Sequence, residues 1–129
     1  MKKNELIWSR LSDHLDDSYK EYVLEKFQDC FDYSPSAYWN PVIADLVKSM
    51  KYREDYFDDV QYKVAQVKMK FGYLRFYVEG ADDFLRGCIA LAELQCSKIC
   101  TYCGSYNEKK AETGRFVKMC VKCNVDEEI

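Results

Sequence analysis

Two pairs of cysteines near the C-terminus have the spacing of a metal site. Cys100 and Cys103 form the first pair, Cys120 and Cys123 form the second, and sixteen residues separate the pairs. Two thiolates separated by two residues can bind one ion, and a second such pair completes a tetrahedral Zn²⁺ site. Gly104 follows the first pair, and glycine readily takes the left-handed conformation that a tight turn around a metal often needs. The pattern predicts one bound zinc; unpaired cysteines or two disulfides are the alternatives.

The predicted zinc has a structural role. Four thiolates leave no open position on the ion for a water molecule, so the site is not a hydrolytic catalyst. A short segment cannot bury a core of its own, and metal binding would supply the free energy that folds it. We expect a zinc ribbon over residues 99–129, packed on the preceding helix. Cys96, four positions before Cys100, is a further candidate ligand, although the four later cysteines already satisfy zinc.

The stretch from residue 60 to residue 80 has the pattern of a β-hairpin. If Phe71 and Gly72 form its turn, three facing pairs on one side of the sheet are apolar, which a random register rarely gives. These pairs are Met69 with Leu74, Val67 with Phe76, and Ala65 with Val78. The alternative is a helix that ends near Gly72, and phenylalanine is a poor residue for a turn that needs positive φ. We favour the hairpin, and in both cases residues 73–78 form a strand.

The other face of the predicted hairpin combines positive charge with aromatic rings. It has Lys68, Lys70, Tyr73, Arg75 and Tyr77. Lys68 would face Arg75, and like charges across a strand pair are destabilising unless an anion lies between them. Aromatic rings beside cations can stack on a base while the cations neutralise its phosphate. We therefore predict a binding site for a small anionic ligand such as a nucleotide; a solvated face that discourages aggregation is the alternative.

The sequence lacks the motifs of common enzymes. His14 is the single histidine, and there is no nucleophile signature and no phosphate-binding glycine-rich loop. Tyr38 and Trp39 would suit the lining of a pocket, but a core role is favoured. The expected protein is not an enzyme.

Three amphipathic helices are predicted before the hairpin. The first buries Ile7 or Trp8 together with Leu11 and Leu15, and the second begins at a capping box from Ser18 to Glu21. The third has Asn40 as its cap and Pro41 in its first position. Its apolar stripe is Val42, Ile43, Leu46, Val47 and Met50.

A fourth helix follows the hairpin and begins at Asp82–Asp83. Its predicted inner face is Phe84, Leu85, Cys88, Ile89, Leu91, Ala92 and Cys96. Together these elements predict an α+β fold in which N-terminal helices pack on a small antiparallel β element. Residues 1–98 would form this core domain, with the zinc ribbon of residues 99–129 attached.

Several features together resemble a group of small bacteriophage and prophage proteins. The group has a Lys-x-Lys-Phe-Gly-x-Leu-Arg-Phe-Tyr signature, here Lys68–Tyr77, ahead of a C-terminal four-cysteine zinc ribbon. The resemblance extends over residues 60–124 and does not include the helical N-terminus. Phe116 stands where tryptophan is common in the group. The resemblance implies a phage setting without an agreed activity, and counter-defence in the host cytoplasm is the expected role.

Composition limits the partners. Nineteen basic and twenty-two acidic residues give a net charge of −3, with acidic clusters at residues 54–55, 58–59 and 126–128. Long duplex nucleic acid would be repelled, whereas a small nucleotide responds to the local basic face. The sequence contains no secretory signal and no apolar run long enough for a membrane span, so we expect a cytoplasmic protein.

Three functions are consistent with these observations. The leading interpretation is a non-enzymatic protein that sequesters a small anionic ligand, such as a nucleotide signal of host defence. The alternative is a protein–protein inhibitor of a host defence or regulatory protein, which would use the acidic helical surface. A nucleic-acid-binding zinc ribbon is the third. The ligand and the oligomeric state stay open at this point.

Overall fold

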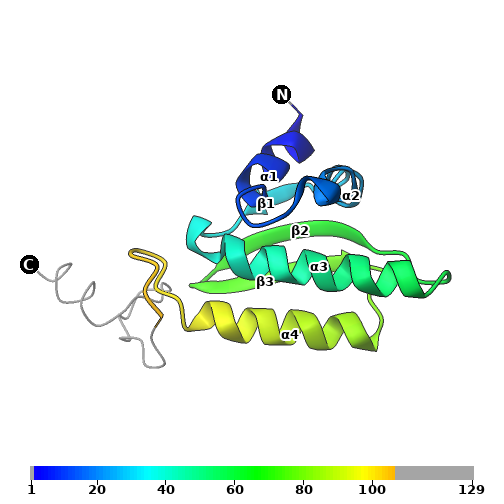
Figure 1. Ribbon diagram of the computed structural model, residues 1–129. Coiled ribbons are helices and arrows are strands. Elements are labelled where there is room, and N and C mark those ends of the chain that lie inside the picture. The colour runs from blue at the N-terminus through cyan, green and yellow to red at the C-terminus, as the bar shows by residue number, and fades with distance from the viewer. Residues whose placement is uncertain (1, 107–129) are drawn as a thin grey trace, which may run out of the picture.

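A three-stranded mixed sheet and the helices against it make up the fold (Figure 1). The computed structural model describes residues 2–106. Its helices are α1 (Lys3–Leu11), α2 (Lys20–Lys26), α3 (Asn40–Tyr56) and α4 (Asp83–Ser97). Its strands are β1 (Asp32–Ser34), β2 (Lys63–Lys70) and β3 (Tyr73–Glu79). The 3₁₀ turns Asp17–Tyr19 and Ala37–Trp39 lead into α2 and α3. The α+β class is confirmed, and most of the predicted ribbon, residues 107–129, lies outside the described residues.

The β2–β3 hairpin has the predicted register over most of its length. Met69 pairs with Leu74, Val67 with Phe76, and Lys68 with Arg75. The register shifts by one residue between Val64 and Gln66, so Val64 pairs with Val78 in place of Ala65. The carbonyl of Ala65 accepts a hydrogen bond from the N–H of Phe31 at 3.0 Å. A β-bulge, which apolar alternation alone does not reveal, therefore explains the one wrong pair.

The hairpin turn requires positive φ at Phe71, which is energetically unfavourable for phenylalanine. Phe71 has φ of 56° and Gly72 has φ of 83°, so both central residues are left-handed, as in a type I′ turn. This turn type matches the right-handed twist of the flanking strands. The twist and the apolar pairs therefore outweigh the local preference of phenylalanine.

The sheet is mixed: the predicted antiparallel element is present as β2–β3, and a third strand that was not predicted joins it. β1 runs parallel to β2, with Tyr33 paired to Val67, and the strand order is β1-β2-β3. A parallel pair needs a long crossover, and the chain between β1 and β2 includes α3. β1 has only three residues, two of them polar, which explains why the sequence pattern does not reveal it.

The core lies between the helices and one face of the sheet. Figure 1 shows α3 and α4 in front of β2 and β3, with α1 and α2 above them. Val67, Leu74 and Phe76 extend into this core from the sheet. Trp39 is fully buried there, which confirms its core role, whereas Tyr38 is half exposed. Alternate positions on β2 and β3 therefore point away from the core.

Met69 is less buried than its pairing suggests. It lies two residues before the turn and keeps 39% of its surface exposed, whereas its partner Leu74 is fully buried.

The helix starts differ from the predictions in two cases. α2 begins at Lys20, and Ser18 lies within the preceding 3₁₀ turn, so the predicted capping box does not form. Asn40 is the first residue of α3 and not its cap, because the turn Ala37–Trp39 continues directly into the helix. The start of α4 is as predicted, since the Asp82 carboxylate accepts a hydrogen bond from the N–H of Leu85 at 3.0 Å.

Within residues 2–106, no helix is long and apolar enough to cross a membrane.

Glu54 of α3 connects three segments of the domain. Its carboxylate accepts hydrogen bonds from the hydroxyl of Tyr22, from Nζ of Lys26 at 2.6 Å and from the N–H of Tyr62 at 2.9 Å. The side chains of Lys26 and Glu54 are only 11% and 10% exposed. Glu54 therefore holds α2 and the start of β2 against α3, and it does not belong to the solvated acidic cluster in which the sequence placed it.

Candidate functional site

The structure brings the five predicted ligand-binding residues together on one face of the hairpin. Lys68 faces Arg75, and Lys70 faces Tyr73. Tyr77 follows on the same face of β3, because side chains two positions apart share a face. Tyr73 and Tyr77 are 36% and 46% exposed, and this face points away from the core. The predicted grouping is therefore present as a continuous surface, which we call the hairpin face.

The cations of the hairpin face are available for a ligand. Among the described residues, no ion pair involves Lys68, Lys70 or Arg75. The guanidinium of Arg75 lies 6.0 Å from the ring centroid of Tyr73 and donates a long hydrogen bond, 3.4 Å, to the carbonyl of Leu74. Cations held beside aromatic rings in this way favour an anion that has a flat ring of its own.

Glu93 of α4 adds a negative group that the sequence analysis missed. Its carboxylate accepts a hydrogen bond, 3.4 Å long, from the N–H of Phe76. Burial raises the pKa of Glu93 above its ordinary value, and the Phe76 hydrogen bond and the charge of Arg75 oppose this rise. The charge of Arg75 is therefore partly balanced from the side of α4, whereas Lys68 has no ion-pair partner among the described residues. Because Glu93 offsets part of the charge of Arg75, one further anionic group beside Lys68 would neutralise the cross-strand pair.

Phe71 is a further surface residue that the sequence analysis did not assign to the site. Its side chain is 52% exposed at the tip of the hairpin, and Nζ of Lys70 lies 5.7 Å from its ring centroid. The left-handed conformation costs a residue other than glycine about 1–2 kcal/mol. Strain of this kind is concentrated at functional positions. The signal in the sequence was the unfavourable residue type at the turn.

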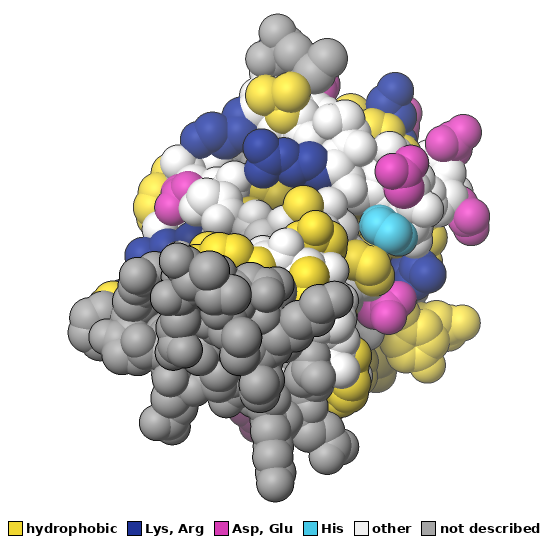
Figure 2. Space-filling view, turned by 90° about the vertical axis from the view of Figure 1, so that its left-hand side faces the viewer, with side chains coloured by type: hydrophobic (Ala, Val, Ile, Leu, Met, Phe, Trp, Pro, Cys, Tyr) yellow, Lys and Arg dark blue, Asp and Glu magenta, His cyan; other side chains and the backbone are white. Residues whose placement is uncertain are grey.

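Charge is distributed unevenly over the end of the molecule shown in Figure 2. Most visible Lys and Arg side chains lie toward the left of that view, which is the back of Figure 1, and most Asp and Glu side chains lie toward the right. An anion that approaches this end therefore meets different potentials on its two sides.

The first cysteine pair lies in a tight turn. The N–H of Tyr102 points at Sγ of Cys100 at 3.4 Å, and the N–H of Gly104 donates to the carbonyl of Cys100 at 2.9 Å. Gly104 has φ of 76°, which confirms its predicted left-handed conformation. Cysteine sulfur is a ligand that Zn²⁺ prefers in structural sites. The described half of the predicted site thus fits a thiolate ligand pair.

The other half of the predicted metal site lies outside the described residues. Cys120 and Cys123 belong to it, so the structure does not test the four-ligand arrangement. Within residues 2–106, no group of three or more candidate ligands is gathered in one place. Cys96 is fully buried among the apolar residues of the core.

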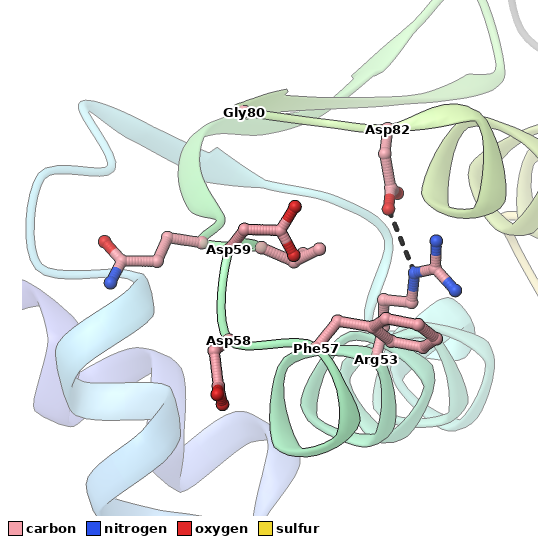
Figure 3. Close-up of a pocket in the computed structure, with 8 residues that line it drawn as sticks. Arg53, Phe57, Asp58, Asp59, Gly80 and Asp82 are labelled. Carbon is pink, nitrogen blue, oxygen red and sulfur yellow. Dashed lines mark hydrogen bonds and ion pairs between the residues drawn. The ribbon is translucent and has the colours of Figure 1, made fainter.

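A separate hollow of about 670 Å³ opens beside the C-terminal end of α3 (Figure 3). Nε of Arg53 lies 3.0 Å from the Asp82 carboxylate, and the ring centroid of Phe57 lies 3.9 Å from the same guanidinium. The remaining carboxylates of the hollow, on Asp58 and Asp59, are exposed. Its one cation is thus already paired, and the hollow is acidic. It does not suit the anion expected at the hairpin face.

Asp82 has several partners in this hollow. Burial opposes its charge, but hydrogen bonds from the N–H of Leu85, the hydroxyl of Tyr62 and Arg53 lower its pKa below the ordinary value. Asp82 is therefore a charged capping residue that joins α4 to α3 and the start of β2. It is not positioned as a proton donor.

Comparisons with protein-family models, with curated proteins and with solved structures give no match.

Proposed function

We propose that this chain is a non-enzymatic binding protein whose hairpin face holds a small anionic ligand with an aromatic ring, such as a nucleotide. The observation that supports this most directly is the Lys68–Arg75 pair, with Tyr73 and Tyr77 exposed on the same face. A phosphate placed between the two cations would remove their repulsion, and a base could stack on either tyrosine.

The shape of the hairpin face limits which kinds of ligand could bind there. Three hollows in the described part of the chain are lined by other residues, and both hairpin-face tyrosines are exposed, so we place the ligand on an open surface. An open platform with cations and aromatic rings suits a nucleotide or a short single strand, because their rings and phosphates are both accessible. Long duplex nucleic acid hides its base faces and adds many charges, and it is not the proposed ligand. Counter-defence in a phage-infected host is the setting we propose for this binding.

The test is a charge reversal with a matched control. Lys68→Glu should weaken binding of a fluorescent mononucleotide probe by roughly 30-fold or more, since one charge-assisted contact of this kind is worth about 2–5 kcal/mol. Lys20→Glu changes the net charge equally on an exposed position of α2 and should leave binding within about twofold. Equal losses in both variants, or no binding of any nucleotide or oligonucleotide by the unaltered protein, would reject the proposal.

A second candidate function is supported by the surface around the C-terminal end of α3. Tyr52 and Tyr56 are exposed there with ring centroids 4.8 Å apart, and Phe57 follows them. The exposed carboxylates of Asp55, Asp58 and Asp59 lie within three residues of these rings along the chain. Aromatic residues within a charged rim are typical of protein interfaces, and this one would bind a basic partner. A protein–protein inhibitor that uses this surface is the alternative proposal.

The two proposals differ in the variants that disrupt them. Tyr56→Lys should abolish capture of a basic host protein from lysate and leave nucleotide binding unchanged. Lys68→Glu should have the opposite pattern.

We also propose that Cys100, Cys103, Cys120 and Cys123 bind one structural zinc. The supporting observation is the turn at Cys100, with its N–H···S contact and left-handed Gly104. The zinc would stabilise the C-terminal segment and has no catalytic part in the proposed function.

A further inference from the structure

The outer face of α4 is apolar although it is exposed. Leu91 and Leu94 keep 56% and 55% of their surfaces exposed, and Gly87 and Ala90 are exposed beside them. These four positions recur at intervals of three and four residues, so they share one face of the helix. Exposure of these two leucines to water is unfavourable in free energy, because burial of apolar side chains is stabilising.

Charged side chains are confined to the two ends of this stripe. α4 has three charged residues, and one of them, Glu93, is directed at the N–H of Phe76 on the sheet side. The other two, Asp83 and Arg86, pair with each other at the start of the helix at 2.7 Å. Lys98 follows directly at the C-terminal cap. The face thus has the Asp83–Arg86 ion pair at one end, an apolar middle, and Lys98 at the other end.

The packing of a single copy of the domain does not explain why position 87 of α4 is a glycine. A Cβ added to it would have no neighbour within 4 Å, so alanine would fit without strain. Glycine in a helix interior costs stability relative to alanine. A glycine on an open helix face is useful when another backbone or side chain approaches closely. It forms a shallow hole in the stripe.

The stripe is complementary to itself when reversed. In an antiparallel pair of two α4 helices related by a twofold axis between Ala90 and Leu91, Gly87 faces the partner's Leu94, so the hole receives a leucine. In the same arrangement Asp83 faces the partner's Lys98, so opposite charges meet at both ends. Self-complementarity of this kind is the property of a twofold interface.

We propose that the chain forms a homodimer through an antiparallel pairing of the outer faces of α4. Leu91 also borders a groove between α3 and α4 that Val42 and Leu46 line, which extends the apolar surface beyond the stripe. The hairpin face is on other elements, so each copy keeps its own ligand surface. The proposed dimer does not depend on the proposed nucleotide binding.

The first experiment measures the oligomeric state of the full chain by sedimentation equilibrium. We expect a dimer in the micromolar range, and Leu94→Arg should weaken it by at least about 100-fold because a charge enters the apolar centre. Gly87→Leu should also weaken the dimer by filling the hole, while it leaves the melting temperature of the monomer equal or higher. A protein that stays monomeric at about 100 µM would overturn the proposal. Coverage of this face by residues 107–129 of the same chain would give that result.

The second experiment uses the charges at the ends and does not depend on Leu94→Arg folding correctly. Asp83→Lys and Lys98→Asp should each weaken the dimer by about tenfold, because like charges then meet at both ends. An equimolar mixture of the two variants should recover the dimer as a heterodimer, since every end contact is again attractive. A mixture that is no tighter than either variant alone would overturn the antiparallel arrangement, and an unrelated partner protein could not produce the recovery.

Discussion

The ring of Tyr38 lies against the α-carbon of Gly104, so close that a Cβ on Gly104 would be 2.4 Å from Cδ1 of the ring. This contact joins the first cysteine turn to the 3₁₀ turn that leads into α3. Because Trp39, the next residue, is fully buried in the core, the position of the cysteine turn is coupled to the packing of the domain.

Metal content is the first test of this coupling. We expect protein purified without chelator to contain about one zinc per chain, and Cys103→Ser to lose the metal and lower the melting temperature. Cys88→Ser changes a half-buried cysteine on α4 outside the pairs and should retain the metal. Elemental analysis and calorimetry provide the measurement. Disulfides at these cysteines under reducing conditions would contradict the zinc proposal.

Phe71 should show opposite effects on stability and binding. Phe71→Asn places a residue that tolerates the left-handed conformation at φ of 56°, and we expect about 1 kcal/mol of added stability. It also removes the exposed ring and should weaken nucleotide binding. Phe71→Ala removes the ring without relieving the strain, and thus separates the two effects. Chemical denaturation and probe titration measure them; a stability loss in Phe71→Asn would show that the ring is a packed element of the fold.

The two members of the cross-strand cation pair should respond differently to charge reversal. Lys68→Glu turns a repulsion with Arg75 into an attraction, and we expect a gain of about 0.5 kcal/mol. Arg75→Glu removes the same repulsion but places a carboxylate near Glu93, so we expect little or no gain. Denaturation midpoints of the two variants provide the comparison, and equal gains would mean that Glu93 does not balance Arg75.

Gly80 and Gly87 should respond in opposite directions to alanine. A Cβ on Gly80 would lie 2.3 Å from the carbonyl oxygen of Gln61, and the residue has φ of 79°, so Gly80→Ala should cost about 2 kcal/mol or more. Gly87→Ala is helical and has open space, and in dilute solution it should gain about 0.5–1 kcal/mol. Urea denaturation at low protein concentration tests both variants. A Gly80→Ala variant with unchanged stability would contradict the described conformation of the connection between β3 and α4.

Stability should fall at alkaline pH because of buried tyrosines. Burial raises the pKa of Tyr33, and burial together with the hydrogen bond to Asp82 raises the pKa of Tyr62. The unfolded chain therefore loses these protons near pH 10 while the folded chain keeps them. Each group then lowers the free energy of unfolding by about 1.4 kcal/mol per pH unit above pH 10 and has no such effect below it.

Tyr33→Phe is the control for the alkaline effect. The Tyr33 hydroxyl is buried and has no hydrogen-bond partner within residues 2–106, so the variant should keep its stability at pH 7. It should unfold less readily above pH 10 than the unaltered protein. Denaturation curves at pH 8 and pH 11 distinguish the two, and an unchanged slope would mean that Tyr33 ionises normally in the folded state.

The sequence predicts well those elements that repeat a pattern over many residues. The stripe of α3 and the apolar pairs of the hairpin each combine several positions, so one unusual residue such as Phe71 does not hide them. The capping box at Ser18 is a four-residue signal, and here the chain satisfies its N–H groups with a 3₁₀ turn instead. Short local signals are therefore easily overridden by the surrounding chain.

The candidate site was predicted only in part. The alternation of the strands placed all five hairpin-face residues together, because their period is fixed by backbone geometry. Glu93 could not be placed beside Arg75, because that proximity depends on how α4 packs along β3. The exposure of Leu91 has the same origin, since helical periodicity alone does not show which side of an apolar helix the domain covers.

The two strand pairings differ in how much chain must be closed to form them. Lys70 and Tyr73 are neighbours across the turn, whereas Asp32 must reach Gln66 around the whole of α3. Closing a short loop loses less entropy, so we expect the hairpin to form early and β1 to join late. Phe71 is the one residue other than glycine with positive φ among the described residues. The least favourable backbone conformation thus lies where folding begins, and it should slow the step on which every later contact depends.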